Sequence, residues 1–301
     1  MFDAHKIIAE HGLDEARQLA KTKLEYTCIT AAVAMLNAQT SEPAYASQMV
    51  TALPHRQPME GNAPARRWRR QIGFDEYCVD SGVFDDGAPM GIPFGAKARI
   101  ALIYLHTQAI CQGSPVLSVP HSRNAYLKAL GMEGGGMSYK LATDQGLRVS
   151  ACRLAISCSG RMLEIGPLVE RFIYDAGVFA PSAPDLDLTN ESERIVLGSA
   201  FYRFILAEAV KIDAQALHIL NNNSWAIDLY IWFASELHRL EAPRPMSWEE
   251  LAFGSGAKYK RPRQLRATFL NTLQLVKAVY PQADVELADG GFVLHPSPPP
   301  L

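Results

Sequence analysis

The clearest hydrophobic periodicity lies in the C-terminal third of the chain. Between residues 261 and 280, apolar side chains recur at steps of four, four, three and four residues, which is the spacing of one face of an α-helix. These side chains are Leu265, Phe269, Leu273, Val276 and Tyr280. Two short apolar runs, 285–287 and 292–294, flank Asp289-Gly290-Gly291, a typical hairpin turn. We therefore predict a long amphipathic helix followed by a β-hairpin.

Shorter elements are predicted upstream of this helix. They are a strand over 193–197, helices over 200–210, 213–220 and 224–240, and a further helix that starts after Ser247. Asp213 and Ser224 are expected to cap the helices that they precede, and Ser247 with Glu250 has the spacing of a capping box. This order of helices and a closing hairpin is typical of a winged-helix domain, whose later helix enters the major groove of DNA.

Residues 96–165 show a similar order. The expected elements are helices over 96–112, 121–130 and 137–154, a β-prone run over 115–119, and strands over 155–159 and 161–165. The prediction for the whole chain is a mainly α protein with small β-wings, of the α+β class, built from two tandem winged-helix domains. The expected boundaries are a helical, partly flexible N-terminal segment over 1–86, a first winged-helix domain over 87–178, a linker over 179–192 and a second winged-helix domain over 193–298.

Composition sets broad limits on function. The 301 residues are 48% hydrophobic and 20% charged, so the chain can bury a substantial core. A net charge of −2 excludes nucleic-acid binding through bulk positive charge but allows local basic surfaces. Charge is unevenly distributed, because residues 251–283 carry six basic side chains and no acid.

The predicted helix over 261–280 therefore begins with a cluster of side chains suited to DNA. Arg and Gln can form paired hydrogen bonds with base edges, and Lys neutralises phosphate. The expected contacts are Lys258, Lys260, Arg261, Arg263, Gln264 and Arg266. Weaker candidates in the first domain are Tyr139, Lys140, Arg148 and Arg153, with Gln145 beside them. Each set could instead form an ordinary solvated surface, and the arginines of 66–70 fit either a phosphate-binding arm or a solvated loop.

No catalytic or cofactor motif is found. The glycine-rich run over 131–136 lacks the P-loop pattern, and no G-x-S-x-G or His-x-His occurs. Five cysteines without a C-x-x-C favour ordinary thiols over zinc or disulfides. We therefore expect a protein that is not an enzyme and has no metal and no cofactor. Because no apolar run could cross a bilayer and no signal-peptide core is present, we expect a cytoplasmic protein without membrane partners.

Three segments carry a resemblance to a known family. They are GIPFGAKARIALIYLHTQAI from Gly91, HSRNAYLKALGMEGGG from His121, and a C-terminal half with S-x-A-x-D-x-Y-x-W from Ser224 and W-E-x-L from Trp248. Together these segments resemble the plasmid-encoded RepA replication initiators of Gram-negative bacteria, over roughly residues 91–298. One departure is a wing after Ile156 that is shorter than the family pattern.

The resemblance implies a function that spacing and composition do not reach. A protein of this family would bind direct repeats, called iterons, in double-stranded DNA at a plasmid origin. It would recruit the host replication initiator and the replicative helicase, and a homodimer acting as repressor would control plasmid copy number. The expected location is cytoplasmic and associated with plasmid or nucleoid DNA.

Two other functions compete with this interpretation. A winged-helix transcriptional regulator would have the same fold, and repeats in the DNA beside the gene would favour the initiator. A DNA-nicking enzyme is disfavoured because no catalytic motif is present.

Overall fold

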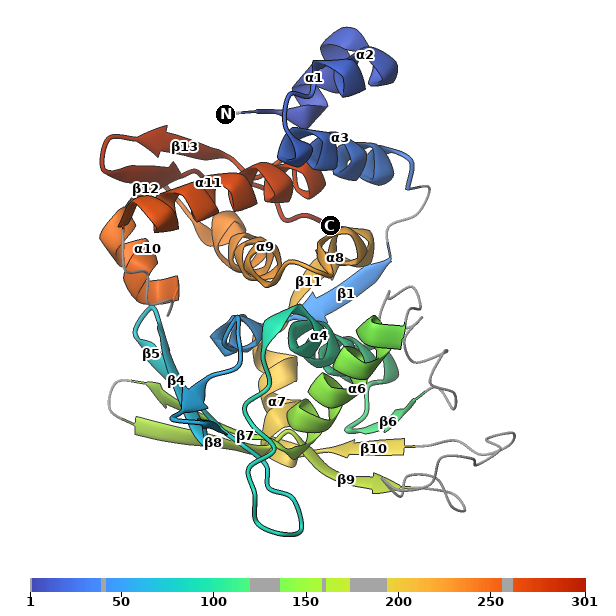
Figure 1. Ribbon diagram of the computed structural model, residues 1–301, viewed down its shortest axis with the longest axis vertical. Helices are drawn as coiled ribbons and strands as arrows, with labels where there is room; N and C mark the ends of the chain where they lie inside the picture. The colour runs from blue at the N-terminus through green and yellow to red at the C-terminus, as the bar shows by residue number, and fades with distance from the viewer. Residues whose placement is uncertain (1, 39–41, 120–135, 159–160, 174–193, 256–261) are drawn as a thin grey trace. The chain divides into compact units, whose positions relative to one another are not determined.

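The computed structural model describes residues 2–38, 42–119, 136–158, 161–173, 194–255 and 262–301 (Figure 1). It is a mixed α+β protein with small antiparallel sheets. The chain divides into two compact units. The central unit is Tyr45–Ala209, and the terminal unit combines Met1–Ala44 with Val210–Leu301. The central unit is thus inserted, in sequence, between the two parts of the terminal unit.

The terminal unit is mostly helical. Its elements are α1 (Ala4–His11), α2 (Leu13–Leu19), α3 (Lys23–Leu36), β11 (Val210–Asp213), α8 (Ala214–Leu220), α9 (Ser224–Glu236), the short 3₁₀ helix η2 (Leu237–Arg239), β12 (Arg244–Ser247), α10 (Trp248–Ser255), α11 (Pro262–Val279), β13 (Val285–Ala288) and β14 (Gly291–Leu294). Strand β1 (Pro43–Ala46), which begins in this unit, pairs with β11.

The long helix predicted at the C-terminal end is α11, and its apolar stripe is buried as expected. Leu265, Phe269, Leu273, Val276 and Tyr280 are each no more than 3% exposed. The helix packs against α3, α9 and α10. The spacing of the apolar side chains was therefore sufficient to identify both the helix and the face that it buries.

The hairpin after α11 belongs to a three-stranded sheet in the order β12-β14-β13. Met246 of β12 and Leu287 of β13 both lie opposite Phe292 of β14. Gly290 forms the turn at a φ of +82°, and a Cβ on Gly291 would overlap the carbonyl oxygen of Met246. Glycine is therefore required at both positions, first for the turn and then for the close approach of β12.

Aromatic rings join this sheet to the helices. Phe269 of α11 stacks on Phe292 at 4.5 Å between ring centroids, and the indole of Trp248 lies 5.6 Å from each of these rings. Trp232 of α9 meets Phe292 edge-on at 6.4 Å. Aromatic pairs at these separations add stability beyond the burial of their surface. One aromatic cluster therefore fixes α9, α10, α11 and β14 together.

The helix caps agree with the sequence at two of three positions. Asp213 accepts hydrogen bonds from Gln215 N and Ala216 N, and Ser247 forms a reciprocal capping box with Glu250. The expected cap at Ser224 is wrong, because the carboxamide oxygen of Asn223 accepts from Trp225 N and Ala226 N. Both Asn and Ser are favoured at this position, so the pattern alone did not distinguish neighbouring residues.

The N-terminal helices belong to the terminal unit, which differs from the expected separate segment over 1–86. Helix α3 packs on α11, and the His5 side chain lies 2.8 Å from the carbonyl oxygen of Ala278. Ile29 and Cys28 of α3 are fully buried. A long-range contact of this kind has no local sequence signal, so the pattern over residues 1–86 could not indicate it.

The central unit contains most of the strands. Its elements are the 3₁₀ helix η1 (Gln48–Ala52), β2 (Met59–Glu60), β3 (Ala63–Pro64), β4 (Arg67–Ile72), β5 (Asp75–Asp80), α4 (Gly95–Gln112), β6 (Val116–Ser118), α6 (Gly136–Ala151), β7 (Arg153–Cys158), β8 (Arg161–Pro167), β9 (Val169–Ile173), β10 (Arg194–Leu197) and α7 (Ser199–Glu208). The helix predicted over 121–130 lies outside the described residues.

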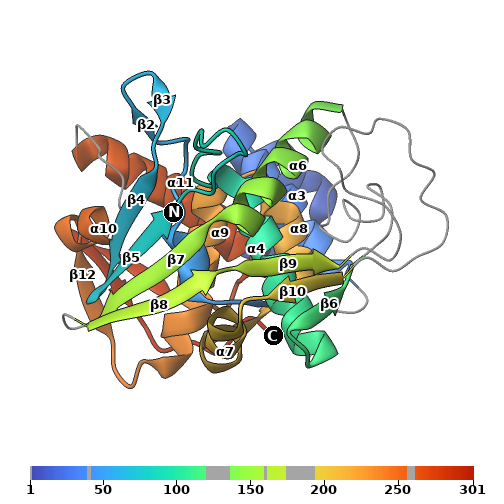
Figure 2. The same ribbon diagram turned by 90° about the horizontal axis from the view of Figure 1, so that it is seen from below.

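Two larger antiparallel sheets organise this unit, beside the two-stranded pair β2-β3 (Figure 2). One has the order β4-β5-β7-β8, so the hairpin predicted from residue 155 onward is extended by a second hairpin from 67–80. The other has the order β6-β10-β9. Strand β6 therefore pairs with β10 and not with the β7–β8 hairpin, whereas in the terminal unit β12 pairs directly with the hairpin that follows α11.

The expected linker does not separate two domains. Strands β9 and β10 flank it in the sequence and pair with each other, with Arg194 opposite Ile173. Both strands belong to the central unit, which continues to Ala209. The linker residues 179–192 lie outside the described residues. A polar, proline-containing segment can connect neighbouring strands as readily as domains, so composition alone does not distinguish the two cases.

Candidate nucleic-acid interface

The face of α11 opposite its apolar stripe is polar and free of acids. At 3.6 residues per turn, Ala267 and Asn271 lie about 160° from the centre of the stripe, and Gln264 lies about 140° from it. These three residues are exposed. Arg263 lies about 120° from the stripe centre and is also exposed. The outward face therefore presents Arg, Gln and Asn, the side chains best suited to paired hydrogen bonds with guanine and adenine.

Of the six DNA contacts predicted in this unit, the structure describes three. Arg263, Gln264 and Arg266 are exposed on the first turns of α11. Lys258, Lys260 and Arg261 fall in 256–261, outside the described residues. Within the described part of the chain, neither Arg263 nor Arg266 has an acidic partner. No carboxylate among the residues that the structure describes therefore neutralises these two guanidinium groups.

Arg266 has an aromatic neighbour that the sequence did not indicate. Its guanidinium carbon lies 5.5 Å from the centroid of the Trp248 ring. Arginine stacks on aromatic faces while its N–H groups stay free at the edge of the plane. The tryptophan stands in the W-E-x-L motif, but only the fold brings it beside α11.

The hairpin after α11 has the opposite charge. Glu286 and Asp289 are exposed on it, and Glu286 lies 3.4 Å from Nε2 of His295. Carboxylates repel phosphate, so in the described part of this surface the basic groups lie on the helix and not on the hairpin. Hydrogen bonding with Ser247, whose backbone N–H donates to the Glu250 carboxylate, keeps the pKa of Glu250 at the start of α10 below its usual value.

In the central unit, helix α6 buries one stripe and exposes few basic groups. Ala142, Gln145 and Val149 are buried, and Lys140 is exposed. The side chain of Tyr139 lies outside the described residues. Gln145, which the sequence grouped with the surface candidates, is a core residue. Of the candidates on this helix, the structure presents Lys140 outward.

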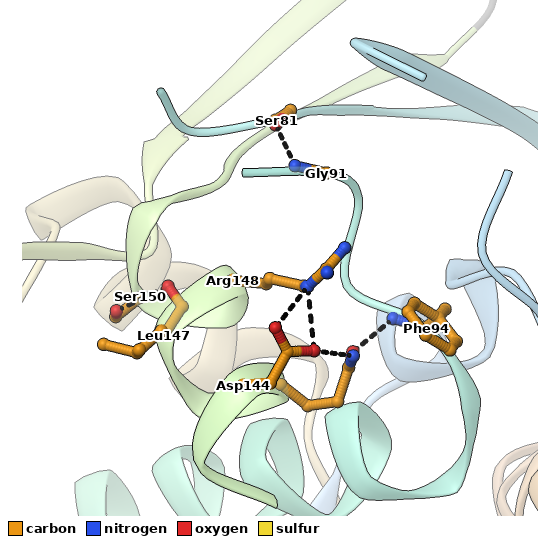
Figure 3. A network of polar contacts seen from close by, with 8 residues as sticks. Ser81, Gly91, Phe94, Asp144, Leu147, Arg148 and Ser150 are labelled. Carbon is orange, nitrogen blue, oxygen red and sulfur yellow. Dashed lines mark hydrogen bonds and ion pairs between the residues drawn. The ribbon is translucent and has the colours of Figure 1, made fainter. Parts of the chain in front are cut away.

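Arg148 lies in a network that attaches α6 to the segment before α4 (Figure 3). Its Nε donates to both carboxylate oxygens of Asp144, at 3.1 and 3.0 Å. Its guanidinium lies over the Phe94 ring at 5.4 Å, and the side chain is only 13% exposed. Gln145 accepts from Phe94 N at 2.7 Å and donates to Asp144 at 2.8 Å. This geometry gives Arg148 a structural role in the network and little surface for DNA.

Arg153 begins strand β7 and is not part of the expected helix over 137–154. It is exposed and lies directly opposite Asp80 of β5. Asp80 also binds Arg67 of β4, at 2.6 and 2.9 Å. Arg153 therefore lies on a sheet, beside a carboxylate that already binds another arginine, and not on a helix that could enter a DNA groove.

The arginine cluster over 66–70 is mostly a structural feature. Arg67 pairs with Asp80, Arg69 lies 3.3 Å from Glu76, and both belong to β4, not to a loop. Arg70 is buried and donates to the carbonyl oxygens of Thr51 and Leu53. Alternation along a strand sends neighbouring residues to opposite faces, which explains why one of these arginines is in the core.

A second buried arginine also donates hydrogen bonds to backbone carbonyl oxygens at the end of η1. Arg99 of α4 is fully buried and donates to Leu53 O at 2.6 Å and to Pro54 O at 3.2 Å. Two guanidinium groups thus satisfy the carbonyl oxygens at the end of η1. Lys97 is also buried, and desolvation lowers the pKa of its ammonium group. Part of the positive charge of helix α4 therefore does not reach the surface.

The described residues show neither a metal-binding cluster nor a membrane-spanning helix. These residues contain no group of three or more His, Cys, Asp or Glu that could hold a metal ion. No helix among them is long and apolar enough to cross a membrane.

The family model described as plasmid-encoded RepA protein matches residues 92–250, which is 159 of 301 residues. The chain belongs to the plasmid-encoded RepA family. This confirms the resemblance drawn from the sequence and places the chain among plasmid replication initiators. The match includes α4, α6 and α9 of this RepA protein, whereas α11 lies beyond it.

Solved structures give a likeness of fold. The RepA chain is similar to a crystal structure of RctB domains 2-3 (RctB-155-483), with a TM-score of 0.50 and 12% identity, over 82% of this chain and 94% of that one. A second structure, of domain 2 and domain 3 of RctB as a selenomethionine derivative, covers 89% of each chain at 12% identity and a TM-score of 0.42. No curated protein matches the chain.

Proposed function

We propose that this RepA protein initiates plasmid replication by binding direct repeats of double-stranded DNA at the origin, with α11 as the recognition helix. The observation that carries the proposal is the outward face of α11. It presents Arg263, Gln264 and Asn271, is free of acids, and is held by a buried stripe on the opposite side. Family membership supports the same function independently.

The topology of the terminal unit supports a winged-helix mode of binding. Helices α9, α10 and α11 precede the β13–β14 hairpin, and β12 between α9 and α10 pairs with that hairpin. In such domains the last helix lies in the major groove. The central unit has a related element order, but its β6 pairs elsewhere and its α6 presents only one basic group of the predicted set. We therefore assign base reading to the terminal unit.

Initiation requires more than recognition. In this proposal, several RepA molecules bound to neighbouring repeats strain an adjacent AT-rich segment and recruit the host initiator and the replicative helicase. A homodimer that binds the same DNA acts as a repressor. The protein itself is non-catalytic and needs no cofactor, because binding energy is sufficient to strain DNA in other architectural complexes.

The decisive experiment is nuclease footprinting on the DNA that flanks the gene. Regularly spaced protected segments with a common sequence are expected, and Arg263→Ala should abolish them at protein concentrations where the native chain protects. A single protected operator without repeats would favour a transcriptional regulator. Absence of any protected sequence would refute the proposal.

A second assay tests the non-catalytic assignment. Supercoiled plasmid carrying the protected segment is incubated with RepA and Mg²⁺ or Mn²⁺, and the products are separated by gel electrophoresis. The supercoiled form should remain intact. Conversion to nicked circles at the protected site would identify a nicking enzyme instead.

A further inference from the structure

The two described arginines of α11 differ in their position around the helix and in the side chains that they pack against. Arg263 lies about 120° from the centre of the buried stripe, among the outward polar residues, whereas Arg266 lies only about 60° from it. Arg266 is therefore on the flank of the helix that faces α10. Both side chains are exposed, but only Arg266 is stacked on an aromatic ring.

The ring beneath Arg266 is held on several sides. Trp248 N donates to the carbonyl oxygen of Gly290 at 3.2 Å, which ties the start of α10 to the hairpin turn. Its indole packs against Phe269 and Phe292 at 5.6 Å, and the Ser247 capping box fixes the same helical turn. Because the Trp248 ring is in contact with α11 and the hairpin and lies in a capped helical turn, it has little freedom to move. The guanidinium above it is consequently restricted to one side of the helix.

This arrangement suits a phosphate better than a base. A recognition helix in the major groove has base edges in front of it and the sugar-phosphate strands along its flanks. A stacked guanidinium presents its N–H groups outward in one plane, which matches the paired oxygens of a phosphate. The outward direction is already occupied by Arg263, Gln264 and Asn271.

We propose that Arg266, held on the Trp248 ring, binds a DNA phosphate at the groove edge, while Arg263 reads a base. Trp248 is a positioning residue in this division of roles. The proposal rests on the assignment of α11 as the recognition helix, and it assigns different tasks to two arginines that the sequence does not distinguish.

The test uses the full chain and a duplex chosen by the protein itself. A preferred duplex is selected from a randomised pool, and its affinity is compared with that of a scrambled duplex of the same composition at several salt concentrations. Arg263→Ala should weaken the selected duplex by about 5- to 150-fold and leave the scrambled duplex nearly unchanged. Arg266→Ala should weaken both duplexes by the same factor and reduce the salt slope by about one.

Trp248 is tested through its coupling to Arg266. Trp248→Leu should reproduce the effect of Arg266→Ala, and it should add nothing in the Arg266→Ala background. Trp248→Phe keeps an aromatic face and should bind nearly as the native chain does. Thermal unfolding followed by circular dichroism establishes that each variant is folded. If Trp248→Leu lowered the affinity for DNA by the same factor with and without Arg266, the tryptophan would act through the fold alone. That result would overturn its positioning role.

A further variant decides the role of Arg266 without disturbing the core. Arg266→Lys keeps the positive charge but loses the planar fork. If Arg266 contacts a phosphate, this variant should bind DNA with the same salt dependence as the native chain. Its preference for the selected duplex over the scrambled duplex should also be unchanged. Collapse of that preference would show that Arg266 reads a base, and the division of roles would be wrong. If no duplex is enriched from the pool and none is bound in preference, the proposed function itself fails.

Discussion

Gly91 is the position where the structure makes the sharpest prediction about stability. It adopts a φ of +90°, and a Cβ built on it would overlap Nη1 of Arg148 and lie 3.2 Å from the Cβ of Pro64. Gly87 provides a matched control, because its φ is +79° and nothing lies within 4 Å of its Cβ position. Alanine at either site therefore meets the same backbone strain, but only at Gly91 does it displace the Arg148 network.

The size of the difference follows from these contacts. An L-residue at positive φ costs about 1–2 kcal/mol, which applies to Gly91→Ala and Gly87→Ala alike. Displacing Arg148 also weakens its hydrogen bonds with Asp144 and its stacking on Phe94, together about 1–2 kcal/mol. Gly91→Ala should thus be about 1–2 kcal/mol more destabilising than Gly87→Ala. For a unit of this size, that difference lowers the melting temperature by roughly 2–8 °C.

Scanning calorimetry measures the melting temperatures, and hydrogen exchange of peptides from 81–94 and from α6 shows where protection is lost. Exchange should accelerate in both segments for Gly91→Ala, but only in the first for Gly87→Ala. The double variant Gly91→Ala with Arg148→Ala should be less destabilised than the sum of the single changes, because the overlap has been removed. Equal melting temperatures for the two glycine variants, or additive effects in the double variant, would refute this account of the network.

Three further predictions concern other parts of the molecule. His106 is fully buried between Ser47 and the Leu102 carbonyl, and burial lowers its pKa from 6.5 to about 4. The contribution of the neutral imidazole to stability is therefore complete above pH 6.5 and is lost as the pH falls toward 4, by about 2 kcal/mol at pH 5. Urea unfolding should show this loss of unfolding free energy for the native chain and no such loss for His106→Gln. Ile29→Ala, at a fully buried position of α3, should lower the unfolding free energy of the terminal unit by about 2–5 kcal/mol, whereas Tyr26→Ala on the exposed side should change it by less than about 0.5 kcal/mol; calorimetry would contradict this if the two variants melted alike. Replacing Glu286 and Asp289 by Lys should strengthen binding to scrambled duplexes and steepen its salt dependence, as measured by fluorescence anisotropy; unchanged binding would place the hairpin away from DNA.

Local patterns in the sequence predicted local structure well. The apolar spacing of 265–280 identified α11 and its buried face, and the Asp-Gly-Gly run identified the hairpin. The Ser247–Glu250 spacing identified a capping box. Each of these features depends on residues close together in the chain, where backbone geometry relates spacing directly to contact.

Features that depend on distant residues were not predicted. The pairing of β9 with β10 across the expected linker, and the packing of α3 on α11, join segments whose sequences carry no signal of each other. The domain boundaries placed from composition therefore differ from the two units of the structure. The same reason explains why Trp248 was not recognised as the neighbour of Arg266, although both residues were noted separately.

Positive charge in the sequence is a poor measure of positive charge on the surface, and this bears directly on the proposed DNA-binding site. Over 87–163, Arg99 and Lys97 are buried, and Arg148 is held by Asp144. Arg263 and Arg266 are exposed, and neither has an acidic partner among the described residues. The two regions differ in where their basic residues lie relative to the buried stripe of the helix. A basic side chain on the stripe must form its hydrogen bonds or ion pairs within the protein, whereas one on the opposite face is free to contact a ligand. A count of basic residues along the chain does not reveal this difference, whereas the helical position of each basic residue identifies the arginines of α11 that are exposed away from its buried stripe.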